Sequence, residues 1–108
     1  MEINSTSYGI VLVTVPSLEL GKEIAQRLLN SKLAACINLF PVNSLYIWQG
    51  EINDDQEYQL IIKTDLNLFQ ELVAEIKTLH NYEVPEIIAL PIINSSASYL
   101  SWLRDSLK

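Results

Sequence analysis

The sequence has 108 residues, 49% hydrophobic and 19% charged, which fits one domain with a core of its own. Its 13 acidic residues outnumber 7 Lys and Arg, and the net charge of −6 disfavours binding to nucleic acids or anionic lipids. No apolar stretch approaches the roughly 20 residues that a membrane-spanning helix needs.

The compartment is indicated by the N-terminus and the cysteine content. Residues 1–7 contain no basic region followed by an apolar core, so no signal peptide is visible. Cys36 is the only cysteine and cannot form an intrachain disulfide, which suits a reducing compartment. We therefore expect a cytoplasmic protein without a membrane partner, with a flexible segment over 1–7 and a single domain over 8–108.

The chain begins with a strand and a helix. Residues 8–15 are β-rich and nearly all apolar, which indicates a central strand. Ser17 suits a helix N-cap, and apolar residues recur every fourth position from Leu20. This spacing predicts an amphipathic helix that ends near residues 30–31.

The middle of the chain is predicted to hold two further strands. The second strand covers 33–39, is interrupted by Pro41 and resumes over 43–49. Turn-forming residues fall within 50–55. Residues 56–64 alternate between core and surface positions, which predicts the third strand.

The last part of the chain completes the pattern. Asp65 can cap a helix over 68–79, a fourth strand covers 86–90, and a last helix starts at residue 94 or 95. The order βαββαβ with a C-terminal helix is typical of the ferredoxin-like α+β sandwich, with four antiparallel strands and two helices on one face.

Two long segments carry no charged side chain. They cover 33–50, which is 18 residues, and 87–103, which is 17 residues. Exposed strand edges are normally protected by charge, so a homo-oligomer interface would explain both segments. The alternative is that they form central core strands and a buried helix.

Few residues point to specific chemistry. His80 is either a helix C-terminal residue that interacts with the helix dipole or a ligand for Cu²⁺ or Zn²⁺. Glu83 and Glu86 flank Pro85 and could act as acid–base groups, as hard-cation ligands, or as solvated or inter-subunit hydrogen-bonding charges. Cys36, inside an apolar strand, is either core filling or a reactive thiol.

Aromatic side chains with polar tips are concentrated in or near the uncharged segments, which favours subunit contacts over stacking on nucleic-acid bases. No glycine-rich phosphate loop is present, and one Cys with one His cannot form the usual metal-cluster spacings. The aromatic residues are Tyr46, Trp48, Tyr82, Tyr99 and Trp102.

Five ordered segments resemble motifs of the CutA divalent-ion tolerance family, over nearly the whole chain from Tyr8 onward. They are KLAACIN at 32–38, the S-x-Y-x-W-x-G pattern at 44–50, KT at 63–64, HNYEVPEI at 80–87 and YLSWL at 99–103.

The resemblance implies a ferredoxin-like protomer in a tight homotrimer whose strands pair across subunit edges, similar in architecture to the PII signalling proteins. It also implies a role in tolerance to divalent metal ions, copper especially, and no enzymatic activity. On this basis we expect Cu²⁺ or another divalent cation to bind weakly at His80, Glu83 and Glu86. The expected inter-subunit cleft contains Cys36, Tyr46, Trp48, Lys63, Tyr82 and Trp102.

Two departures from the family pattern lower the expected affinity for metal. Val13 stands where some members carry a cysteine implicated in copper binding, and Leu79 stands where they carry the first of two histidines. One imidazole per protomer is a poor donor set for a borderline cation.

Two other functions stay open. The chain could be a PII-like signalling or interaction module that binds a small anionic molecule or a protein partner in the subunit clefts. An enzyme that uses Cys36 or the pair Glu83 and Glu86 has the least support.

Overall fold

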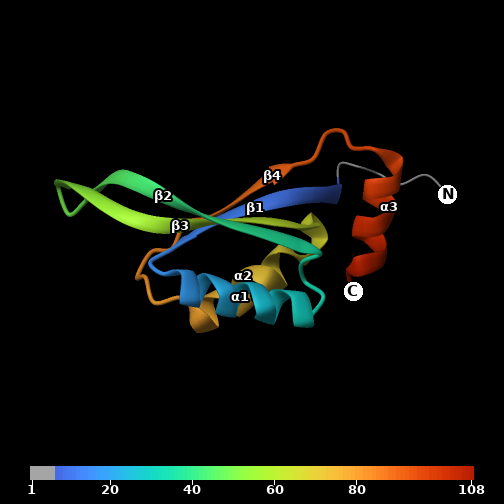
Figure 1. Cartoon of the computed structure of the whole chain (residues 1–108), viewed down its shortest axis with the longest axis horizontal. Helices are drawn as coiled ribbons and strands as arrows, with labels where there is room; N and C mark the ends of the chain where they lie inside the picture. The colour runs from blue at the N-terminus through green and yellow to red at the C-terminus, as the bar shows by residue number, and fades with distance from the viewer. Residues whose placement is uncertain (1–6) are drawn as a thin grey trace.

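The computed structural model describes residues 7–108, and the first six residues of the segment predicted to be flexible lie outside the described residues. A long hairpin of two strands extends from a body made of sheet and helices, which gives extents of 51 × 25 × 22 Å (Figure 1). The elements are β1 (Tyr8–Val15), α1 (Leu18–Asn30), β2 (Cys36–Trp48), β3 (Glu51–Asp65), the 3₁₀ turn η2 (Leu66–Leu68), α2 (Phe69–Leu79), β4 (Ile87–Pro91) and α3 (Ala97–Ser106).

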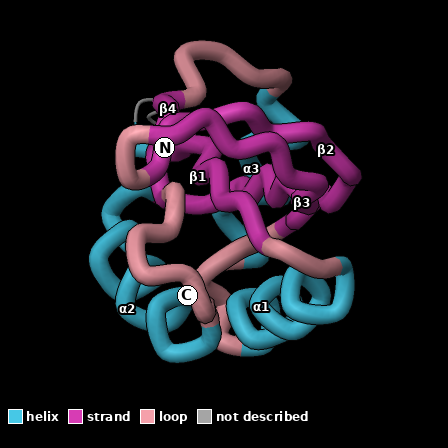
Figure 2. The backbone as a smooth tube through the Cα atoms, turned by 90° about the vertical axis from the view of Figure 1, so that its left-hand side faces the viewer, coloured by secondary structure: helices cyan, strands magenta, loops and turns pink. Residues whose placement is uncertain are grey.

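The four strands form one sheet in the order β2-β3-β1-β4, and every neighbouring pair is antiparallel. Helices α1 and α2 lie side by side on one face of this sheet (Figure 2), and α3 lies at the end opposite the hairpin tip (Figure 1). The predicted ferredoxin-like α+β fold with a C-terminal helix is confirmed.

Helix α1 begins where the sequence predicts. The Ser17 hydroxyl accepts a hydrogen bond from the Leu20 amide at 3.1 Å, which satisfies one of the free N–H groups of the first turn. Ile24 and Leu28 are fully buried against the sheet. A methyl group at Gly21 would lie 2.7 Å from Leu39 Cδ2, so the helix approaches the sheet closely here and an alanine would require the Leu39 side chain to shift.

The hairpin differs from the prediction. β2 runs without interruption from Cys36 through Pro41 to Trp48, because β2 is an edge strand and an edge tolerates a residue without an N–H group. The turn consists of Gln49 and Gly50 alone, whose φ angles of 53° and 79° are typical of a two-residue hairpin turn. Residues 53–55, predicted to be turn residues, therefore belong to β3.

The other boundaries shift by one to three residues. Residues 33–35 precede β2, and β4 covers Ile87–Pro91 instead of 86–90. Asp65 caps the turn η2 through the Asn67 amide at 2.9 Å, and α2 starts at Phe69. Helix α3 begins at Ala97 because Ser96 is its N-cap.

The core lies between the sheet and the helix pair. Alternate residues of β1 and β3 meet the inner faces of α1 and α2, and these side chains are fully buried. They include Val11, Val13, Val15, Ile24, Leu28, Leu60, Ile62, Leu72 and Ile76.

The two uncharged segments contain β2 and β4, which are the two edge strands of the sheet. The alternative that these segments supply central strands is therefore wrong. Neither α1 nor α2 covers the opposite face of the sheet (Figure 2). Tyr8 packs against Leu100 and Leu103 of α3 at one end of the sheet, and Ile88 and Leu90 of β4 are 50% and 49% exposed. Both edge strands are thus uncharged, and the β4 part of the outer sheet face is apolar and open in the protomer.

Within residues 7–108, no helix has the length and apolar character that crossing a membrane requires.

Candidate ligand-binding pocket

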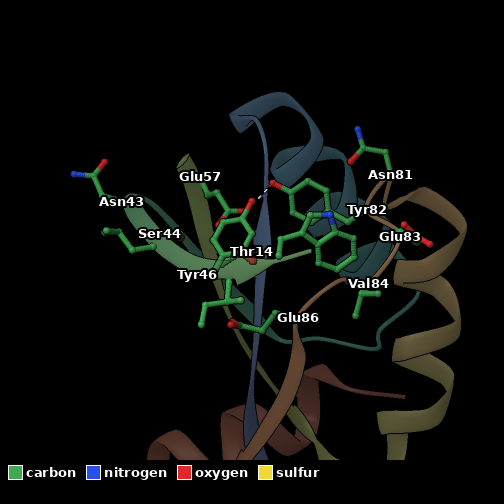
Figure 3. Close-up of a pocket in the computed structure, with 13 residues that line it drawn as sticks. Thr14, Asn43, Ser44, Tyr46, Glu57, Asn81, Tyr82, Glu83, Val84 and Glu86 are labelled. Carbon is green, nitrogen blue, oxygen red and sulfur yellow. Dashed lines mark hydrogen bonds between the residues drawn. The ribbon is translucent and has the colours of Figure 1, made fainter. Parts of the chain in front are cut away.

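A pocket of about 830 Å³ lies between the hairpin and the loop that joins α2 to β4 (Figure 3). We call residues 43–56 the arm and residues 80–86 the loop. The arm, the loop and neighbouring parts of β1 and β3 all contribute to the pocket wall. The lining residues are Thr14, Asn43, Ser44, Leu45, Tyr46, Ile47, Trp48, Glu57, Asn81, Tyr82, Glu83, Val84 and Glu86.

A buried acid and a tyrosine connect the two walls of the pocket. The Tyr82 hydroxyl donates a hydrogen bond to Glu57 Oε2 at 2.6 Å (Figure 3). Glu57 is only 6% exposed. Partial burial and the bond to Glu57 raise the pKa of Tyr82 well above its usual value, so the phenol stays protonated and remains a donor.

A second tyrosine–carboxylate pair lies on the arm. The Tyr46 hydroxyl donates to Asp55 Oδ2, and this bond raises the pKa of Tyr46. The register of β2 and β3 explains the grouping, because alternate residues from Ser44 to Trp48 and from Glu51 to Glu57 share one face of the hairpin. Two neutral phenols and two carboxylates are thereby held on this face.

His80 holds the loop against β1. Its Nε2 lies 2.7 Å from the Thr14 carbonyl oxygen, and its Nδ1 accepts a hydrogen bond from the Tyr82 amide at 3.1 Å. A carbonyl can only accept and an amide N–H can only donate, so the imidazole is the tautomer with its hydrogen on Nε2. The centroids of the His80 and Tyr82 rings are 4.7 Å apart, so His80 also helps to orient Tyr82.

The three predicted metal ligands are only partly brought together. Glu83 and Glu86 line the pocket, whereas His80 does not, and both of its ring nitrogens are already hydrogen-bonded. Among residues 7–108 no group of three or more His, Cys, Asp or Glu side chains is arranged to hold a metal ion. The residues of one protomer therefore do not fit a copper site, and the metal assignment stays a prediction.

The predicted cleft residues fall into two sets. Tyr46, Trp48 and Tyr82 line the pocket. The other set lies toward α3, at the opposite end of the protomer: Lys63 Nζ is 3.9 Å from Cys36 Sγ, and the half-exposed Trp102 contacts Tyr99, with a centroid distance of 5.5 Å.

Glu57 and Asp55, which accept the two tyrosine hydrogen bonds, were not predicted as site residues from the sequence. Glu57 lies within the predicted third strand over 56–64, but alternation alone does not mark it as an acceptor. Asp55 was assigned to the turn within 50–55, so it was not placed on the same strand face as Glu57. The partner of Glu57 could not be found from the pattern, because Tyr82 lies 25 residues away in an irregular loop.

Comparisons with known proteins agree on one family. The family model of the CutA1 divalent ion tolerance protein matches residues 9–106. The Divalent-cation tolerance protein CutA of Thermus thermophilus is 48% identical over 98 residues, which are 90% of this chain and 95% of that protein. The chloroplastic Protein CutA of Arabidopsis thaliana is 46% identical, and the match covers 90% of this chain and 54% of that protein.

A solved structure shares the whole fold. The structure of the periplasmic divalent cation tolerance protein CutA from Archaeoglobus fulgidus has a TM-score of 0.91 and 39% sequence identity. The superposition covers 94% of this chain and 99% of that one. Sequence motifs, fold and comparisons all agree, and the chain belongs to the CutA family of divalent-cation tolerance proteins.

Proposed function

We propose that this divalent-cation tolerance protein is a homotrimeric binding module, and that its ligand site is the pocket between the arm and the loop. The observation that carries the proposal is the bond from Tyr82 to the buried Glu57, which holds an aromatic and acidic cavity open toward solvent. Both tyrosine hydroxyls donate to carboxylates and the pKa of each is raised, so neither phenol is activated as a nucleophile, which favours binding over catalysis.

The homotrimer is supported by surface that one protomer cannot bury. Leu45, Ile47 and Ile52 of the arm are 69%, 76% and 77% exposed, and both edge strands lack charged side chains over the segments described above. Apolar surface on this scale is typical of an interface between protein chains. Pairing of edge strands between subunits, as predicted from the family resemblance, would cover it.

The two sets of cleft residues suggest how subunits would be arranged. The arm set and the set that contains Cys36, Lys63 and Trp102 lie at opposite ends of the protomer. A closed ring of three protomers, each arm contacting the α3 end of the next protomer, would bring the two sets together. The pocket would then lie in the inter-subunit cleft that the resemblance implies.

Direct binding of Cu²⁺ is the second candidate function. It is favoured by Glu83 and Glu86, which line the same pocket and supply oxygen donors. It is opposed by His80, which would have to lose a hydrogen bond to Thr14 or to Tyr82 before coordinating a metal.

The cytoplasmic location belongs to the same proposal. The Archaeoglobus relative is described as periplasmic and the Arabidopsis relative as chloroplastic, so the cytoplasm stays a prediction for this chain.

Native mass spectrometry of the metal-free protein, titrated with Cu²⁺, separates the candidates. We expect a trimer that takes up no stoichiometric copper. A monomer would overturn the assembly. Stoichiometric copper in the wild type that is lost in the double variant Glu83→Gln/Glu86→Gln, but kept in the control Glu23→Gln on α1, would replace the proposed function by the second candidate.

A further inference from the structure

We infer that the pocket binds a small organic cation, specifically a primary alkylammonium group held by carboxylates and aromatic faces. The inference rests on the proposed function, because it assigns a ligand class to the same pocket. It differs from the anionic ligand that the analogy with PII-like modules suggests.

The charge of the pocket favours a cation. The described lining residues include three carboxylates, Glu57, Glu83 and Glu86, and no Lys or Arg. The ion pairs formed among residues 7–108 join Arg27 to Glu75, Arg104 to Asp105 and Lys108 to Glu71, so the pocket acids have no cationic partner within their own protomer. An anionic ligand would be repelled by all three.

Glu57 gives the most direct indication that the pocket binds a cation. Glu57 is only 6% exposed as a residue, and its Oε2 accepts a hydrogen bond from Tyr82. No buried side-chain oxygen or nitrogen of the described residues lacks a hydrogen-bond partner, so Glu57 carries its charge at the pocket wall without a buried, unpaired atom. A buried carboxylate is normally paired with a positive charge or with several donors, because removing it from water is costly. An ammonium group in the pocket would supply the positive charge.

The aromatic residues favour an organic cation over a metal ion. Tyr46, Trp48 and Tyr82 line the pocket, and both phenol hydroxyls donate to carboxylates instead of to the cavity. Their ring faces are left as contact surface, and a cation above such a face is attracted by the ring quadrupole. A phenol that donates to a carboxylate also carries more electron density in its ring, which strengthens this attraction.

The size of the pocket agrees with an organic ligand. Its volume of about 830 Å³ lies within the range of roughly 300–1,000 Å³ found for small-molecule sites. A bare divalent ion would leave most of this space and all of the aromatic surface unused. A primary ammonium with an alkyl chain would direct its three N–H donors toward the acids and its chain along the rings.

The test uses the full-length trimer and isothermal titration calorimetry, which measures binding without replacing either tryptophan. The probes are n-butylammonium and its neutral analogue 1-butanol, with tetramethylammonium as a cation that cannot donate hydrogen bonds and citrate as an anion.

We expect a saturable heat of binding with n-butylammonium and binding about tenfold weaker for both 1-butanol and tetramethylammonium. The double variant Glu83→Gln/Glu86→Gln should weaken n-butylammonium by about tenfold, whereas Glu23→Gln should have no effect. Nα-acetyl-lysine amide tests whether the ammonium can come from a protein side chain. Binding as tight as n-butylammonium would support a peptide source of the same chemistry, and no binding would support a free amine.

Three results would overturn the inference. Equal binding of 1-butanol or tetramethylammonium would show that the primary ammonium is not recognised. Saturable binding of citrate in the pocket would leave the proposed function intact and replace the ligand class. Absence of binding by every probe to an intact trimer would show that no small cation enters the pocket. Failure of the proposed function is distinguished from this result by the copper titration, which would then show a monomer or stoichiometric copper.

Discussion

The body and the arm of this protomer both carry large apolar side chains but differ in what covers them. In the body, Leu72 and Ile76 of α2 pack on the sheet and are completely buried. In the arm, Ile47 and Ile52 form a cross-strand pair that is more than three-quarters exposed. The body therefore accounts for its own stability, whereas the arm needs a second chain to bury its apolar residues.

The largest loss of stability should come from a substitution that creates a cavity in the body. We expect Leu72→Ala to lower the free energy of unfolding by about 2–5 kcal/mol, because the sheet and α1 cannot collapse into the space. Ile47→Ala in the arm should cost an isolated protomer less than about 0.5 kcal/mol. Urea unfolding measures both, at one protein concentration and with the oligomeric state checked by light scattering. Equal losses would show that the arm is as well packed as the body.

The next effect concerns the open sheet face. Ile88→Asp places a carboxylate on β4 where the proposed interface would bury it, and a buried unpaired charge costs about 3–5 kcal/mol. We expect the trimer to dissociate while the far-ultraviolet circular dichroism of the protomer is kept. The control Glu23→Lys changes charge on the helical side of the body, where no interface is proposed. An Ile88→Asp variant that stays trimeric would place the interface elsewhere.

A smaller effect is expected at the base of the arm. Tyr82→Phe leaves Glu57 without its donor and should lower the free energy of unfolding by about 1–3 kcal/mol at neutral pH. The control is Tyr58→Phe, because the Tyr58 hydroxyl makes no hydrogen bond within residues 7–108 and its removal should cost less.

The same pair predicts a pH dependence. Because the pKa of Tyr82 in the folded protein is raised above 10.0, the value of a free tyrosine, the stabilisation is complete below pH 10. Above pH 10 the unfolded chain loses the proton and the folded chain keeps it, so stability falls as the pH rises. The difference between wild type and Tyr82→Phe should therefore shrink above pH 10 in urea unfolding. A difference that grows there would contradict the assigned bond.

The smallest effects lie at the tip of the arm. Gln49 adopts a φ of 53°, which asparagine tolerates better than glutamine, so Gln49→Asn should raise stability by about 0.5 kcal/mol. Gly50→Ala should lower the stability by about 1 kcal/mol, because a φ of 79° strains any residue with a side chain. The loss is limited to this backbone strain, since no neighbouring atom lies within 4 Å of the added methyl group. Thermal unfolding checks both signs, and a loss with Gln49→Asn would show that another contact holds Gln49.

Periodicity and capping residues were sufficient for most of the fold. The repeat from Leu20 to Leu28 and the cap at Ser17 depend on residues three or four positions apart, so the sequence alone located α1. The same holds for the strand over 8–15 and for the order of the elements. Pro41 misled the prediction because its effect depends on whether a strand is central or at an edge, and a local pattern does not contain that information.

The sequence by itself determined the family, the element order and the presence of uncharged surface. Only the tertiary structure decided what the candidate residues do. It joined Tyr82 to Glu57 and His80 to Thr14, across 25 and 66 residues, and thereby made His80 a positioning residue of the loop. The reason is physical: helices and strands follow from neighbours in the chain, whereas a pocket forms where segments distant in sequence pack together.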